Sequence, residues 1–271
     1  MTELSDFSQI KTFFLALAWT QPRILGLFAL VPIFPKGVLP GILRMGLAAG
    51  LGVVVAPSLM NAVDTAQWDK GEVIFLLVKE AFVGLTLGFL ISVPFWAFEA
   101  MGFVVDNQRG ASISGTLNPL TSDDSSPLGI LFSQAFIVFF FISGGFLLML
   151  ETLYGSFRIW NVFAWTPTFR AESISLLIAQ LSQLVVLMLL MASPMIVAML
   201  LAEMGLALVS RFVPQLQVFF LAMPIKSALA FLVLVLYVGV LFDYAQALVG
   251  DLPKILEFLD DQWRPAAGPL R

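Results

Sequence analysis

Six long apolar segments limit what this chain can fold into. They cover residues 13–34, 45–60, 73–96, 128–153, 174–209 and 218–248, in a sequence that is 59% hydrophobic and 12% charged. A bilayer core about 30 Å thick takes about 20 helical residues. Backbone groups in lipid must be paired internally, and these segments are too long for the roughly 10-residue strands of a barrel. The sequence therefore predicts an all-α integral membrane protein with long helices, some of them kinked.

The residue types that are missing restrict the chemistry. The 271 residues include no cysteine and no histidine. The usual ligands of zinc, copper and haem are therefore absent, as are thiol nucleophiles and imidazole bases. We accordingly expect no metal, no cofactor and no enzyme activity. The net charge of −4 and the absence of a basic run also argue against nucleic acid as a partner.

Charges inside the apolar segments predict helix packing. Arg23 lies near the middle of the first segment, and Lys79 and Glu80 lie near the start of the third. Charges at membrane depth are expected to be paired and to face protein or a water-filled cavity. Two Gly-x-x-x-Gly pairs, Gly46/Gly50 and Gly84/Gly88, could let another backbone approach closely.

The stretch 99–115 is unusually polar for this chain. A helix running on from Glu99 would place Asp106 and Arg109 on one side, with Gln108 next to them. Residues 110–129 are rich in Gly, Ser, Thr and Pro and predict a loop over about 106–127. It could be an ordinary hydrophilic connection. Alternatively, its apolar residues suit a loop that fills a pore and leaves it.

Two features concern the last third of the chain. Glu203 is eight residues from Arg211, too far for an intrahelical pair, so its partner is expected elsewhere. For Glu80 and Glu203, charge pairing that fixes helix register is favoured over a proton relay. Arg211, Pro214 and Gln215 interrupt two long apolar segments and predict the turn of a helical hairpin.

Four stretches together resemble the FliR/SctT family, the export-gate subunits of flagellar and virulence type III secretion systems. They are VPIFPKGVLPGILRMGLA (31–48), EAMGFVVDNQRGAS (99–112), SSPLG (125–129) and SRFVPQLQVFFLAMPIK (210–226). The resemblance runs nearly end to end, and the ending TSDDSSPLG favours the virulence SctT type over flagellar FliR.

The resemblance implies an architecture and partners. Residues 1–165 would be SctR-like, 166–262 an SctS-like long helical hairpin, and 263–271 a short tail. One copy would assemble with five SctR-like and four SctS-like subunits in the bacterial inner membrane, with an SctU-like switch protein beside them. Unfolded proteins would leave through the central pore.

The resemblance also implies a plug that closes this pore. Glu99, Asp106, Gln108 and Arg109 would anchor its base through a charge network. The plug itself would comprise Arg109, Gly110, Ala111, Ser112, Ile113, Ser114, Gly115, Thr116 and Leu117.

Two other functions remain open at this point. A proton- or cation-coupled secondary transporter could use Glu80, Glu99 and Glu203, although no internal repeat supports it. A purely structural assembly subunit could use the polar stretch only as a contact surface.

Overall fold

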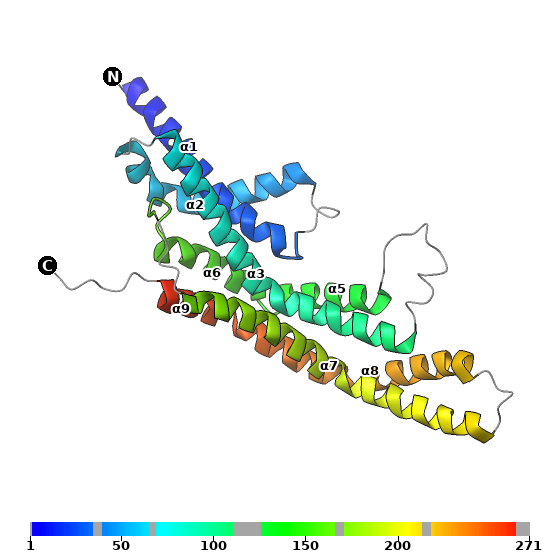
Figure 1. The fold of residues 1–271 in the computed structure, drawn as a ribbon. Coiled ribbons are helices and arrows are strands. Elements are labelled where there is room, and N and C mark those ends of the chain that lie inside the picture. The colour runs from blue at the N-terminus through cyan, green and yellow to red at the C-terminus, as the bar shows by residue number, and fades with distance from the viewer. Residues whose placement is uncertain are drawn as a thin grey trace. The chain divides into compact units, whose positions relative to one another are not determined.

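The computed structural model describes residues 2–34, 40–65, 69–110, 126–165, 171–212 and 218–263. All regular structure within these ranges is α-helical, which confirms the predicted fold class. The helices (Figure 1) are α1 (Thr2–Leu30), α2 (Gly41–Thr65), α3 (Lys70–Arg109), α5 (Pro127–Ile142), α6 (Gly145–Ile159), α7 (Ala171–Phe212), α8 (Val218–Gly250) and α9 (Leu252–Trp263).

Within the described residues, five stretches of helix are long and apolar enough to cross a membrane. They are Phe7–Leu30, Gly41–Val63, Lys70–Arg109, Leu177–Phe212 and Leu221–Ile255, and α5 with α6 makes a sixth if this bent pair counts as one span. The chain is therefore a multi-pass membrane protein.

The fourth apolar segment differs from its prediction. The sequence predicted a single segment over 128–153, whereas α5 and α6 meet at a bend of 76°. Gly144 has a φ of +81°, in the left-handed region that only glycine adopts easily, and Ser143 closes α5 by donating its N–H to the carbonyl of Phe139 at 2.8 Å. Both sides of the bend are apolar, so the hydropathy of the sequence does not reveal this break.

The chain divides into two compact units. The first comprises Met1–Ser92, Gly144–Leu177 and Asp251–Arg271, and the second Val93–Ser143 and Ile178–Gly250. This division is discontinuous in sequence. The division at residue 165 predicted above concerns a likeness to two separate subunits, and it stays a prediction.

In the first unit, α1 and α3 meet at backbone distance. A Cβ on Gly84 would collide with the backbone of Arg23, and a Cβ on Gly88 would lie 2.8 Å from the carbonyl oxygen of Leu27. Around Gly46 and Gly50, by contrast, an added Cβ meets nothing within 4 Å. Only the second glycine pair therefore packs helices together within this part of the chain.

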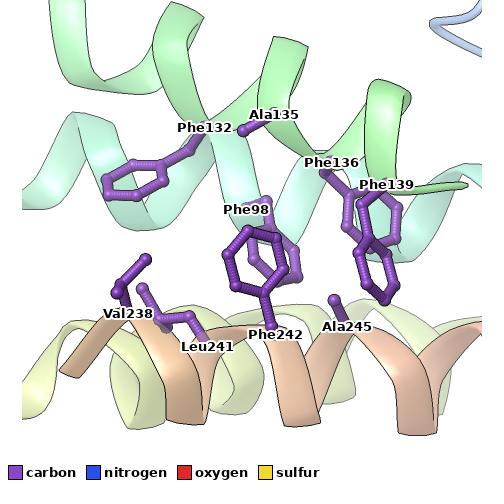
Figure 2. A pocket seen from close by; sticks show the side chains of 9 residues that line it. All are labelled: Phe98, Phe132, Ala135, Phe136, Phe139, Val238, Leu241, Phe242 and Ala245. Carbon is purple, nitrogen blue, oxygen red and sulfur yellow. The ribbon is translucent and has the colours of Figure 1, made fainter. Parts of the chain in front are cut away.

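In the second unit, aromatic rings join α3 to α5. Phe136 lies edge-to-face with Phe95 at 4.7 Å between ring centroids and stacks on Phe98 at 4.6 Å. Toward α8, the ring centroids of Phe139 and Phe242 lie 5.5 Å apart. An apolar cavity of about 50 Å³ lies between these helices, and Figure 2 shows the side chains that line it. It is lined by Phe98, Phe132, Ala135, Phe136, Phe139, Val238, Leu241, Phe242 and Ala245.

Candidate functional site

The polar end of α3 is held by one carboxylate. Asp106 is only 2% exposed and accepts hydrogen bonds at both oxygens. Its Oδ1 accepts from Arg109 Nε at 2.7 Å, while its Oδ2 accepts from Ser126 Oγ at 2.6 Å and from the backbone N–H of Leu128 at 2.9 Å. Asp106 therefore ties together the two helix ends on either side of residues 111–125.

Local sequence explains why α5 begins where it does. Ser126 is the N-cap of α5, with its hydroxyl accepting from the N–H of Gly129 at 2.9 Å, and a proline occupies the first turn. Side-chain oxygens satisfy the otherwise unpaired N–H groups there, and the helix dipole favours a negative charge at that end. The carboxylate of Asp106 supplies that charge from another helix.

Glycines bring the two helices close beside this carboxylate. A Cβ on Gly102 of α3 would lie 2.5 Å from the backbone nitrogen of Gly129, and a Cβ on Gly129 would lie 3.1 Å from the carbonyl oxygen of Glu99. Larger residues would separate α3 from α5 and stretch the hydrogen bonds of Asp106.

Arg109 also connects this site to the hairpin. Its guanidinium lies over the ring of Phe231 on α8, 5.3 Å from the centroid. A cavity of about 350 Å³ lies beside it. The cavity is lined by Asn107, Gln108, Arg109, Gly110, Glu203, Leu206, Ala207, Ser210, Ala222, Met223 and Lys226.

The predicted site residues lie in different surroundings. Asp106 and Arg109 pair directly, and Gln108 lines the cavity beside them. Glu99 is exposed and lies one turn before Gly102 on α3. The remaining plug residues Ala111, Ser112, Ile113, Ser114, Gly115, Thr116 and Leu117 lie outside the described residues, as do Pro214 and Gln215 of the hairpin turn, while Arg211 lies in the last turn of α7.

A second buried polar cluster lies in the first unit. Glu80 accepts from Arg23 through both oxygens, at 2.7 and 2.9 Å, and its Oε1 lies 3.0 Å from Lys79 Nζ. Arg23 also donates to Ser156 Oγ and to the carbonyl of Trp160. Every charge in this cluster therefore has a partner of opposite sign or a hydrogen-bond acceptor.

Two cations face one anion in this cluster, and backbone carbonyls offset the imbalance. Lys79 Nζ donates to the carbonyls of Asn161, Val162 and Ala164 at 2.7 to 3.2 Å, just past the end of α6. A helix C-terminus carries partial negative charge, which favours a cation there. This satisfied, rigid arrangement fits a structural role.

The third charge pair confirms a prediction for Glu203. Its Oε2 lies 3.0 Å from Lys226 Nζ on α8, so the partner does come from another helix. The Glu203 side chain is 51% exposed and borders the polar cavity. The pair links α7 and α8, which run side by side (Figure 1).

Sequence reasoning missed several members of these sites. Ser126 could have been found, because Ser before Pro ahead of an apolar run is a helix-start signal. Ser156 and Phe231 carry no such signal, since only the fold brings them to Arg23 and Arg109.

Known proteins resemble this chain over most of its length. A sequence profile of the family described as "Bacterial export proteins, family 1" matches residues 14–252. Yop proteins translocation protein T of Yersinia pestis is 40% identical over 225 residues, which cover 83% of this chain and 86% of that protein.

Two further relatives come from other secretion systems. Surface presentation of antigens protein SpaR of Shigella sonnei is 33% identical over 250 residues, or 91% of this chain and 94% of its own. Flagellar biosynthetic protein FliR of Bacillus subtilis is 29% identical over 221 residues, which cover 81% of this chain and 85% of that protein.

Proposed function

The chain belongs to the bacterial export proteins, family 1, and from this premise we propose that it is a subunit of the export gate of a type III secretion system. Relatives named for Yop translocation and antigen presentation match it at higher identity than the flagellar one, so the virulence type is favoured. It is a component of a protein-export apparatus, and in this proposal its role there is non-enzymatic.

In this proposal the protein forms a pore with partners in the bacterial inner membrane. Five SctR-like and four SctS-like subunits surround the pore with one copy of this chain, an SctU-like protein lies beside them, and unfolded proteins pass through. Exposed apolar side chains along α7 and α8 suit helix packing with such partners.

The chain would also contribute the plug that closes the pore. Residues 109–117 form the plug, with Asp106 and Arg109 anchoring its base and Glu99 and Gln108 beside them. The observation that carries this proposal is the buried Asp106 carboxylate, which holds both α3 and the start of α5. Small and apolar residues at the tip suit a closure that excludes water and ions.

A deletion tests the plug. Removing Ile113 to Leu117 is expected to leave the complex assembled and to make the membrane leak ions, as measured by potassium efflux from cells. A matched variant replaces the same five residues with Gly and Ser. It keeps the loop length, and it is expected to leak less than the deletion. Normal assembly with a tight membrane in the deletion would exclude the plug and leave a purely structural subunit.

The transporter alternative is not favoured. Glu80 and Glu203 are held by cations, and the family is one of export proteins. Purified protein alone in proteoliposomes is expected to catalyse no proton or sodium uptake, and coupled uptake would restore this alternative.

A further inference from the structure

The contacts of Asp106 constrain how the end of α3 and the start of α5 can move relative to each other. The carboxylate accepts from one donor on α3 and from two donors at the start of α5. If α3 and α5 moved apart, a buried carboxylate would lose the two α5 donors together. Such a group is costly to leave unsatisfied.

Two further layers of contact reinforce this junction. Beside Asp106, Gly102 and Gly129 bring the two backbones together. One turn further along α3 and two turns further along α5, Phe136 of α5 stacks on Phe98 of α3. Polar, backbone and aromatic contacts thus succeed one another along the same pair of helices, which makes the pair a stiff element.

The junction is also tied to α8, because Arg109 contacts both Asp106 and the ring of Phe231. The end of α3 is therefore fixed on two sides, by α5 and by the hairpin.

We propose that the last turn of α3 and the first turn of α5 stay joined through Asp106 while the export gate opens and closes. This inference rests on the proposed function. The transported chain then passes without separation of these two helix ends.

The absence of cysteine from the sequence makes this measurable with spin labels. Phe103 on α3 and Leu131 on α5 are both exposed, so cysteines there should be tolerated. The pair F103C/L131C is labelled in the complete complex with cysteine-free partners. Its distance distribution is recorded by pulsed EPR at rest and with a secreted substrate whose folded fusion domain stalls it in the channel.

We expect the mean distance to change by less than about 2 Å on stalling, the scale that separates rigid from rearranged contacts. A larger shift would overturn the inference. If this pair fails to assemble, F103C with I130C replaces it, because Ile130 is also exposed.

A substitution tests whether Asp106 is the cause. In D106N one carboxylate oxygen is replaced by an NH₂ donor, so either Arg109 Nε on α3 or the N–H of Leu128 on α5 faces a donor where it had an acceptor. At rest, the distribution of distances between the two labels is expected to become broader or to shift to longer distances. D243N makes the same chemical change at an exposed carboxylate on α8 and is expected to leave it unchanged. An unaltered distribution in D106N would also overturn the inference.

A second label pair separates this inference from the plug proposal. The distance between S114C and L131C should change when the substrate stalls, if residues 109–117 leave the pore. No change in the S114C/L131C distance would exclude the plug proposal. The F103C/L131C and D106N results would still test whether α3 and α5 stay joined.

Discussion

At the scale of single residues, Glu80 is the most constrained position in the first unit. Its side chain is fully buried and carries the only negative charge in direct contact with Arg23 and Lys79 among the described residues. Breaking a buried ion pair by removing one partner leaves an uncompensated charge, which is far costlier than losing a surface pair.

Glu80→Gln is therefore expected to destabilise the protein strongly. Both cations would remain buried without a counter-charge, at a cost of about 3–5 kcal/mol. The expected result is a large drop in the amount of assembled complex on native gels and a lower thermal midpoint in detergent. Glu151→Gln is the control, because Glu151 is exposed on α6. Equal complex yields and equal thermal midpoints for the two variants would show that the charge cluster contributes little to stability.

The residue scale also shows what sequence can predict about a site. That Arg23, Lys79 and Glu80 must be paired followed from their place in apolar segments, and the structure confirms it. That they pair with one another did not follow, because Arg23 and Glu80 are 57 residues apart. The pairing of Asp106 with Arg109 could be anticipated from helical spacing, whereas its bond to Leu128 depends on how α5 packs.

At the scale of helices, glycine spacing alone did not identify a contact. Gly46/Gly50 and Gly84/Gly88 share the same pattern, yet among the described residues only the second pair meets a neighbouring backbone. The pattern permits close approach without saying whether a partner helix is there.

Gly84→Ala is expected to push α1 away from α3. The new methyl would meet backbone atoms of Arg23, which cannot move aside as a flexible side chain could. Overpacking of this kind costs about 1–3 kcal/mol, so the thermal midpoint of the purified complex should fall. Gly46→Ala adds the same methyl where nothing lies within 4 Å. A midpoint for Gly84→Ala at or above the wild-type value would contradict this packing.

The apolar cavity between α5 and α8 should accept more volume. Ala245 is buried and lines it, so Ala245→Val places two methyl groups against a space of about 50 Å³. Cavity filling commonly stabilises by about 0.5–2 kcal/mol, which should raise the midpoint. Ala228→Val is the control on the exposed face of the same helix. A lower midpoint only for Ala245→Val would mean that the cavity closes in solution.

Helix boundaries show where composition misleads. The sequence predicts an apolar segment that ends at residue 96 and a loop over about 106–127, whereas α3 continues without a break to Arg109 and α5 already begins at Pro127. Polar residues in the last turns of α3 are paired with each other and with α5, so they need not lie in a loop. A hydropathy average treats each polar residue as if it had no partner, so it places the end of the helix too early.

At the scale of the whole molecule, the candidate membrane spans differ in how much of each is buried within the chain. In the most apolar part of α3, 56% of residues are buried within the chain, against 22% in α7 and 11% in the Leu221–Ile255 span. The hairpin helices therefore have apolar surface that this chain alone does not cover.

Co-expression is expected to decide whether the protein accumulates. Produced alone, it should yield little monodisperse material, whereas SctR-like and SctS-like partners should raise the yield and give a single large species by native mass spectrometry. SctS-like protein alone serves as the control. A stable monomer with the same yield would contradict the proposed assembly.

The buried contact between Arg23 and Glu80 has a consequence for biosynthesis. The insertion machinery meets α1 before Glu80 has been made, because 57 residues separate the two. An arginine deep in a span costs up to about 3.5 kcal/mol on the insertion scale, so α1 by itself enters lipid poorly. We therefore expect the stable integration of α1 to follow the synthesis of α3, with the two helices entering the bilayer as one cooperative unit.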